Sequence, residues 1–189
     1  LAYIIPATYL SSFLKGDKNT SEIYTDKHLP QMYAKMFTST YKVAQKTINN
    51  IVHQHRIPKR VLEIGSGIGT FTRHILPIFP QETEYFYTDV SPYFFESAKK
   101  EFSNYNIKYN IFNMDIDPVL QGYQRHSFDL IIAASVLHVG KDLRKILSNI
   151  KNMLTPGGIL LIIEETIQHY PFELTMGLQQ GWDNYEDYH

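Results

Sequence analysis

The chain has 189 residues, no cysteine and a formal net charge of −1 at pH 7. A chain of this length hides roughly 70% of its unfolded surface, which is enough for one well-packed domain. The near-zero charge gives no field that would draw the chain to nucleic acid or to an anionic membrane, and the absence of cysteine excludes disulfides, thiolate nucleophiles and cysteine-based metal sites.

The first 58 residues have a helical pattern. Between positions 6 and 56, apolar side chains recur at the 3.6-residue period of one helix face, as at Ala44, Ile48 and Ile51. We therefore divide the chain into a helical cap at residues 1–58 and a core at residues 59–189. Because the sequence begins at Leu1 rather than Met and stops without a closing strand, we expect it to be part of a larger protein.

From position 60 onward, short runs rich in β-forming residues alternate with helical patterns. This alternation predicts an α/β fold in which a mostly parallel sheet has helices on both faces. A doubly wound sheet of this kind ordinarily ends with an antiparallel hairpin, and no such pattern follows position 165. The expected strands are 60–65, 84–89, 107–113, 128–134 and 159–164, and the expected helices are 70–79, 92–102 and 141–154.

A glycine-rich loop, EIGSGIGT beginning at Glu63, follows the first expected strand. Gly65, Gly67 and Gly69 would let the backbone turn sharply and approach a nucleotide-like ligand, although a plain tight turn explains such loops about as often. The dinucleotide fingerprint needs a further glycine where this chain has Thr70. An acidic residue followed by G-x-G-x-G is instead the pattern of methyltransferases, whose cofactor has an amino-acid tail, and the Glu63 carboxylate would help to hold its cationic end.

Two further carboxylates follow the next two expected strands. Asp89 can accept hydrogen bonds from both hydroxyls of a ribose, and its alternative role, capping the helix that begins near Pro92, suits Ser91 better. Asp115 can accept from an adenine amino group while Ile116 packs against the ring. Since parallel strands end at one edge of a sheet, the three carboxylates should meet there and bind adenosine. The predicted cofactor site also includes the adjoining residues Ser66, Val90 and Ser135.

Residues 60–182 resemble the methyltransferase domains of modular polyketide synthases. The resemblance rests on VLEIGSGIGTFTRHILPIF, YTDVSPYFFESAKKEF, FNMDIDPVLQGY, FDLIIAASVLH, DLRKILSNIKNMLTPGGILLIIEET and FELTMGLQQGW. It implies a Rossmann-like class I methyltransferase fold with an N-terminal helical lid, and S-adenosyl-L-methionine as the cofactor. It also implies neighbouring synthase domains and, as partner, an acyl carrier protein with a phosphopantetheine-linked acyl chain, usually methylated at the α-carbon of a β-ketoacyl thioester.

His138 is the candidate base. It follows the fourth expected strand, at the edge of the cofactor loops, and an imidazole with a pKa of about 6.5 suits proton removal near neutrality. A single histidine is more often a packing or surface residue, but the resemblance implies that His138 and Glu164, at the end of the fifth strand, form a catalytic dyad. Neighbouring strand residues point to opposite faces, so only one of Glu164 and Glu165 should face the pocket.

Other functions stay open from the sequence. O-methylation of a hydroxyl or enol oxygen could use the same base, an inactive domain could serve structure alone, and a nicotinamide dehydrogenase is opposed by Thr70. The remaining histidines form no metal-binding pattern, so we expect no metal. No apolar run approaches the roughly 18 residues of a membrane span, which, with the lack of cysteine, predicts a cytoplasmic location.

Overall fold

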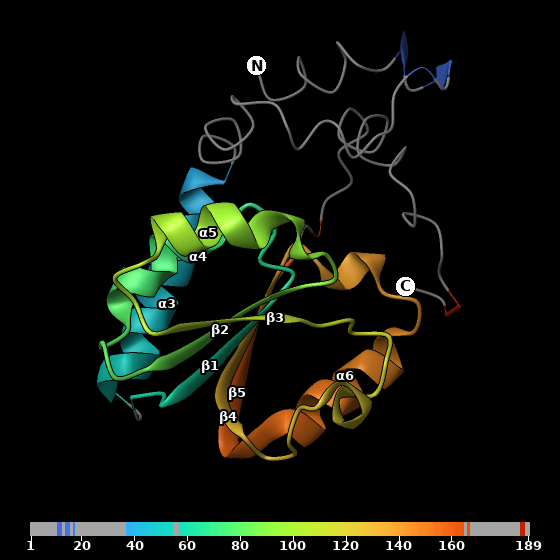
Figure 1. Cartoon of the computed structure of the whole chain (residues 1–189). Coiled ribbons are helices and arrows are strands. Elements are labelled where there is room, and N and C mark those ends of the chain that lie inside the picture. The colour runs from blue at the N-terminus through green and yellow to red at the C-terminus, as the bar shows by residue number, and fades with distance from the viewer. Residues whose placement is uncertain are drawn as a thin grey trace.

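The structure, a computed structural model, describes residues 37–54 and 57–164 and the isolated positions 11, 12, 14, 15, 17, 166, 186 and 187. In these parts of the chain no helix is long and apolar enough to cross a membrane. The strands are β1 (Arg60–Ile64), β2 (Glu84–Asp89), β3 (Ile107–Ile111), β4 (Phe128–Ala134) and β5 (Leu154–Ile163) (Figure 1). The α-helices are α3 (Thr38–Gln54), α4 (Thr70–Ile75), α5 (Phe95–Glu101) and α6 (Leu143–Met153), and the 3-10 turns are η2 (Leu76–Ile78), η3 (Pro92–Phe94), η4 (Pro118–Gln121) and η5 (Leu137–Val139).

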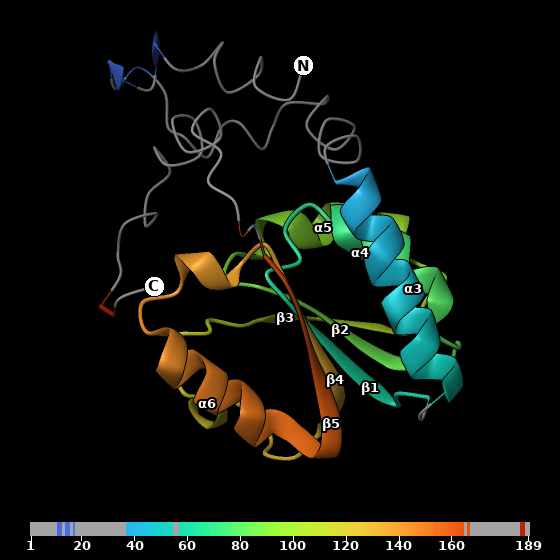
Figure 2. The same ribbon diagram turned by 180° about the vertical axis from the view of Figure 1, so that it is seen from behind.

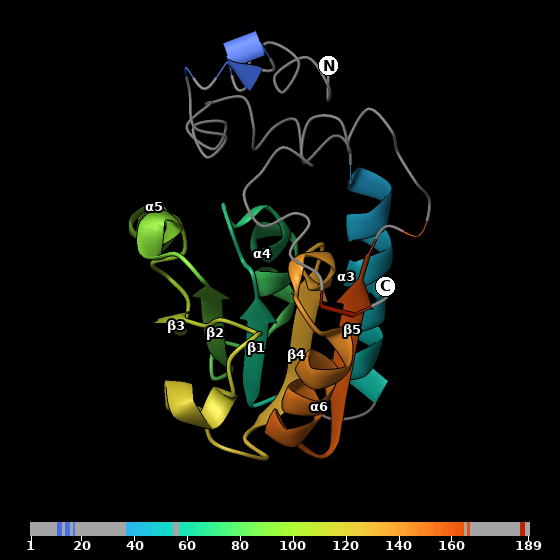
Figure 3. The ribbon, with the colours of Figure 1, turned by 90° about the vertical axis from the view of Figure 1, so that its right-hand side faces the viewer.

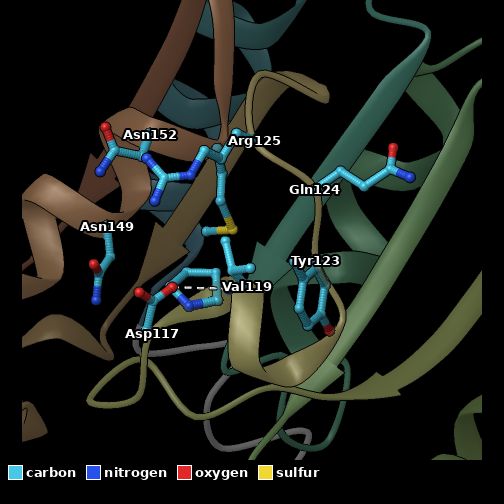
Figure 4. A pocket seen from close by; sticks show the side chains of 9 residues that line it. Asp117, Val119, Tyr123, Gln124, Arg125, Asn149 and Asn152 are labelled. Atoms are coloured by element: carbon cyan, nitrogen blue, oxygen red, sulfur yellow. Dashed lines mark hydrogen bonds between the residues drawn. The ribbon is translucent and has the colours of Figure 1, made fainter.

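The five strands form one parallel sheet in the order β3-β2-β1-β4-β5. Figure 3 shows this order, with α6 in front of β4 and β5. The winding changes direction between β1 and β4, because the chain first moves from β1 toward β3 and then returns to the other side of β1. Open α/β sheets bind ligands beyond the carboxyl ends of the strands at such a switch point.

Alternate residues of β1, β2 and β4 supply two separate cores. Val61, Tyr85 and Leu130 pack with α3, α4 and α5 on one face, whereas Leu62 and Ile131 pack with α6 on the other. All five side chains are essentially inaccessible to solvent. Figures 1 and 2 show the two helical layers on opposite sides of the sheet. The prediction of a parallel sheet with helices on both faces is therefore confirmed.

Helix α3 belongs to the first of these cores. Ala44, Ile48 and Ile51 are buried, on the face that the 3.6-residue period predicted, and the ring of Tyr41 lies 5.7 Å from that of Phe71 in α4. Helix α3 thus covers the sheet directly. Nearly all of residues 1–36, and of the segment after Glu164, lie outside the described residues, so the lid and the missing hairpin both stay predictions.

The last strand begins earlier than the sequence predicts. We expected a helix to position 154 and a strand from position 159, but β5 begins at Leu154, directly after α6. Leu154 pairs with Phe128 and Ile159 pairs with Leu130, so the residues between them form an irregularity in the ladder. Gly157, with φ +78°, lets the chain bulge while it stays beside β4.

Prolines shape the helical segments after β1 and β2. The expected helix at 70–79 divides into α4 and η2, since Pro77 has no N–H to donate. The expected helix at 92–102 begins as η3, and the Ser91 hydroxyl accepts from the N–H of Tyr93 at 3.2 Å. This cap confirms that Ser91, not Asp89, begins the helical segment.

Candidate functional site

The carboxyl edge of the sheet brings most of the predicted site residues onto neighbouring loops. The glycine loop after β1 is hydrogen-bonded to the end of β2: the N–H of Ser66 donates to the carbonyl of Thr88 at 2.8 Å. The loop after β3 is bonded to the segment after η5, where Lys141 N–H donates to Asp115 Oδ1 at 2.9 Å. Both hydrogen bonds lie at the carboxyl edge, where the parallel strands end together.

The glycine loop is shaped by its backbone and by one neighbour. Gly65, Gly67 and Gly69 have φ values of +66°, +52° and +72°, which L-residues with a side chain rarely adopt. A Cβ at Gly65 would lie 2.4 Å from Cγ2 of Val136, so the loop is pressed against the turn after β4. Among the described residues, a Cβ at Gly67 would meet only the Gly65 carbonyl, at 4.0 Å. Within this part of the chain, the middle of the loop therefore faces open space, where a ligand can approach the backbone.

Asp89 is held at the end of β2 with its carboxylate directed at the glycine loop. Oδ2 accepts from the N–H of Gly67 at 3.0 Å, and Oδ1 accepts from the N–H of Ser91 at 3.0 Å. The side chain is buried, with 8% exposed. Burial raises the pKa of this carboxyl, and the backbone N–H groups of Ser91, Gly67 and Val90 offset part of that rise. Each oxygen has a second lone pair, so ribose hydroxyls could still donate to it.

Asp115, Ile116 and Val90 lie at the same edge. Asp115 is partly buried, and its loop is fixed by the bond from Lys141 and by Asn113, whose Oδ1 accepts from Asp115 N–H at 2.9 Å. Ile116 and Val90 are 44% and 65% exposed. Exposed apolar side chains beside a buried carboxylate offer a surface on which a planar ring could stack. These positions are compatible with the adenosine site predicted from the sequence.

Glu63 lies deeper than the sequence led us to expect. Its side chain is buried under α4, and Oε2 accepts from the hydroxyls of Thr72 at 2.6 Å and Tyr85 at 2.7 Å. Burial raises the pKa of this carboxyl, hydrogen bonds from Thr72, Tyr85 and Ser66 lower it in part, and the negative charge of Asp89 raises it further. The carboxylate thus fastens β1 to α4 and β2. Its contact with the cationic end of a cofactor stays a prediction.

Ser66 lies within the glycine loop, and Thr70 directly follows it as the first residue of α4. Both are buried, and Ser66 Oγ donates to the carbonyl of Glu63 at 3.5 Å. Thr70 Oγ1 is buried without a hydrogen-bond partner among the described residues. A buried hydroxyl without a partner costs free energy. The unpaired hydroxyl of Thr70, next to the glycine loop, is therefore consistent with a site that binds a polar ligand.

His138 and Glu164 meet at the carboxyl ends of β4 and β5. Nδ1 of His138 lies 2.9 Å from Oε2 of Glu164, while Oε1 accepts from the N–H groups of Val136 at 2.9 Å and Leu137 at 2.7 Å. Burial opposes ionisation of Glu164, but the hydrogen bond and charge of His138 and the two backbone donors outweigh it, so the pKa of this carboxyl is lowered. The carboxylate that faces His138 is that of Glu164, whereas Glu165 lies outside the described residues.

Ser135 begins the turn that presents His138. It has φ +50°, one of two non-glycine residues among those described with a positive φ, and its N–H donates to the carbonyl of Ile163 at 2.7 Å. Such a conformation costs a residue with a side chain about 1–2 kcal/mol. Backbone strain directly before a paired histidine and carboxylate is typical of a functional site.

Sequence reasoning missed the residues that support the loop from below. Thr72, Tyr85 and Tyr87 contact Glu63 or Gly67 through their hydroxyls. The alternation of β2 does place Tyr85, Tyr87 and Asp89 on one face, but their targets follow only from the register of β1 with β2. Among the residues that the structure describes, no group of three or more His, Asp or Glu side chains is arranged to hold a metal ion.

Residues 62–160 match the model of a family described as "methyltransferase domain". In sequence, the chain is similar to the highly reducing polyketide synthase verA of Penicillium polonicum, with 36% identity over 190 residues. That match covers 96% of this chain and 7% of the synthase, so the chain spans only a small part of this relative's length.

Two solved structures are similar in both fold and sequence. The CurJ carbon methyltransferase matches with a TM-score of 0.87 and 30% identity, over 99% of this chain and 52% of that one. The trans-methyltransferase CalH, solved in complex with SAH, matches with a TM-score of 0.77 and 26% identity, over 93% of this chain and 50% of that one. The chain spans about half the length of each.

Proposed function

This chain belongs to the methyltransferase domain family and takes its methyl group from S-adenosylmethionine; from that premise we propose that it methylates the α-carbon of a β-ketoacyl thioester in a polyketide synthase. Its fold is the Rossmann-like class I methyltransferase fold. The observation that supports the proposed reaction most directly is the pairing of His138 with Glu164 at the ligand-binding edge of the sheet.

The glycine loop and two aspartates would hold the methyl donor. Asp89 would accept from the ribose hydroxyls and Asp115 from the adenine amino group, and the exposed side chains of Val90 and Ile116 could pack against the ring. The open space at Gly67 would admit the amino-acid end of the ligand. S-adenosylmethionine supplies an electrophilic methyl group, so the protein mainly has to generate a nucleophile and align it.

His138 would generate that nucleophile. The α-carbon of a β-ketoacyl thioester lies between two carbonyl groups, which spread the electron pair that remains when its C–H bond breaks. Nε2 of His138 would take the proton, and Glu164 would stabilise the charged ring through Nδ1. The α-carbon then forms its new bond to the methyl carbon as the sulfur–methyl bond breaks, and His138 later returns the proton to solvent.

The acyl substrate would be presented on a carrier protein. A phosphopantetheine arm could bring the thioester to the carboxyl edge while neighbouring synthase domains perform the other steps. The support is similarity in sequence: verA is a polyketide synthase of which this chain matches 7%. The size of that synthase is consistent with a methyltransferase that works on an intermediate passed between domains.

The product of methyl transfer tests the proposal. The protein would be incubated with S-adenosylmethionine and either a β-ketoacyl or a β-hydroxyacyl pantetheine thioester, and the products analysed by mass spectrometry. We expect the β-ketoacyl substrate alone to gain a methyl group, with loss of one α-deuterium from an α-dideuterated sample. Methylation of the β-hydroxyacyl substrate with both deuterium atoms retained would instead establish O-methylation. No transfer to either thioester would contradict the proposed substrate class.

A further inference from the structure

Both backbone polar groups of Gly67 are held by side chains of one strand. The N–H of Gly67 donates to Asp89 Oδ2 at 3.0 Å, and the Gly67 carbonyl accepts from the hydroxyl of Tyr87 at 2.6 Å. Tyr87 and Asp89 are two residues apart on β2, so their side chains project from the same face of the sheet. Two side chains of β2 therefore hydrogen-bond to the backbone of the middle glycine of the loop.

A loop of this composition needs such support. Glycine loses more conformational freedom on ordering than any other residue, and three glycines with positive φ fall within five positions. Contacts within the protein can order these glycines before the ligand arrives, or the loop can become ordered only when the ligand binds. In the second case, the observed affinity falls by the fraction of molecules whose loop is already competent.

We propose that Tyr87 is a positioning residue for the methyl donor, whose hydroxyl keeps the Gly67 carbonyl in place so that the loop is ordered before S-adenosylmethionine binds. Tyr87 acts through Gly67 and needs no contact with the ligand. The proposal depends on the use of this cofactor and not on the identity of the acyl substrate. Failure of the β-ketoacyl reaction would therefore leave it unaffected.

The hydroxyl can serve in this way because the ring beneath it is fixed by packing. Tyr87 is fully buried, and its ring centroid lies 5.4 Å from that of Tyr109, 6.1 Å from that of Phe95 and 6.2 Å from that of Phe102. Burial, with the nearby charges of Glu63 and Asp89, raises the pKa of the phenol well above its usual value. The hydroxyl therefore keeps its proton at neutral pH and remains a hydrogen-bond donor.

Tyr87→Phe tests the proposal, because it removes the hydroxyl and keeps the packed ring. Tyr109→Phe is the matched control, since the Tyr109 hydroxyl donates to the backbone carbonyl of Ala98 in α5, at 3.1 Å, and not to the loop. Calorimetry would give the Kd of S-adenosylhomocysteine for each protein. We expect Tyr87→Phe to bind about 3- to 10-fold more weakly, the scale of one neutral hydrogen bond, and Tyr109→Phe to bind like the unmodified protein.

Two further measurements separate positioning from general stability. The KM for S-adenosylmethionine should rise in Tyr87→Phe while kcat at saturating donor changes by less than about twofold, since a filled site has an ordered loop. Amide hydrogen exchange of residues 65–69 should be faster in ligand-free Tyr87→Phe than in Tyr109→Phe, and this comparison needs no catalytic activity. Equal affinities in the two variants, or equal exchange of the loop amides, would overturn the proposal.

Discussion

Nδ1 of His138 lies 2.9 Å from Oε2 of Glu164, and the other oxygen of the same carboxylate accepts two backbone N–H bonds from the turn that carries His138. The carboxylate is therefore fixed on both sides. An ionised carboxylate can only accept, so it selects the imidazole tautomer whose hydrogen is on Nδ1 and whose lone pair is on Nε2. That tautomer is the one a general base requires.

His138→Ala is expected to lower kcat for methyl transfer by about 10²–10⁴-fold, the usual contribution of a positioned general base. The Kd of S-adenosylhomocysteine should change little, because the glycine loop and Asp89 do not depend on the imidazole. Single-turnover rates and calorimetry would give the two quantities. A His138→Ala protein that keeps most of its rate on a β-ketoacyl thioester would show that the α-proton leaves by another route.

Glu164→Gln should be nearly as damaging. If the amide oxygen of Gln accepts from Val136 and Leu137, the amide NH₂ faces Nδ1 of His138. Nδ1 must then accept, so the imidazole hydrogen moves to Nε2. An Nε2 that already has a hydrogen cannot take a proton from the substrate. We expect a loss of about 10²–10⁴-fold in kcat. Glu101→Gln, which removes a carboxylate paired with Arg73 on the surface, is the control and should remain active. Activity within tenfold of normal in Glu164→Gln would refute the tautomer argument.

Asp89→Ala should weaken S-adenosylhomocysteine by about 1–3 kcal/mol, because a charged acceptor is lost and the N–H of Gly67 loses its partner. The pH dependence gives a second check. Burial raises the pKa of Asp89, so protonation, which removes an acceptor for the ribose, should begin above the usual pH range of an aspartate. Affinity should fall with decreasing pH in the unmodified protein and be flat over the same range in Asp89→Ala. Parallel pH profiles would exclude Asp89 from the ribose site.

Glu63→Gln should change how stability depends on pH. An acid whose pKa is higher in the folded than in the unfolded state stabilises the fold most below its unfolded value of 4.5 and loses that contribution as pH rises through the folded pKa. Relative to Glu63→Gln, the unmodified protein should therefore become less stable as pH rises above 4.5, by about 1.4 kcal/mol for each tenfold difference in proton affinity between the folded and unfolded states. Urea unfolding at a series of pH values from 4.5 upward measures this. A constant difference would mean that Glu63 does not titrate there.

Ser135→Gly separates backbone strain from ligand contact. Glycine accepts φ +50° freely, so the substitution should relieve about 1–2 kcal/mol of backbone strain. The greater conformational entropy of glycine in the unfolded chain should cost about 0.5–1 kcal/mol. The free energy of unfolding should therefore be unchanged or slightly higher. Ser135→Ala loses the same hydroxyl and keeps the strain. If the hydroxyl belongs to the cofactor site, both variants should bind S-adenosylhomocysteine more weakly. Normal affinity in both would remove Ser135 from that site.

The sequence predicted the sheet well because its signals are local. Glycine loops, β-rich runs and a 3.6-residue period each occupy a few neighbouring positions, and β2 and β4 have the predicted bounds. The start of β5 was wrong, because a Thr-Pro-Gly-Gly segment normally ends pairing, and only the position of β4 shows that it forms a bulge here.

The contacts that hold the site residues in place were harder to predict than the location of those residues at the carboxyl edge of the sheet. The positions of Asp89 and Asp115 follow from strand ends, whereas the burial of Glu63 depends on what α4 and β2 place around it. The hydrogen bonds that the N–H groups of Val136 and Leu137 donate to Glu164 likewise depend on how β4 and β5 are staggered. Such contacts join residues far apart in the chain, and no spacing within a single sequence encodes them.

The close approach of Gly65 to Val136 has a consequence for protein engineering. The N–H of Val136 donates to the carboxylate that would orient the proposed base, so the loop proposed to hold the methyl donor and the turn proposed for proton transfer share one packed contact. A misplacement of about 1 Å can cost a hundredfold in rate. A glycine loop grafted from another methyltransferase should therefore work only when the turn at 135–138 is transplanted with it, since the two segments behave as one exchangeable module.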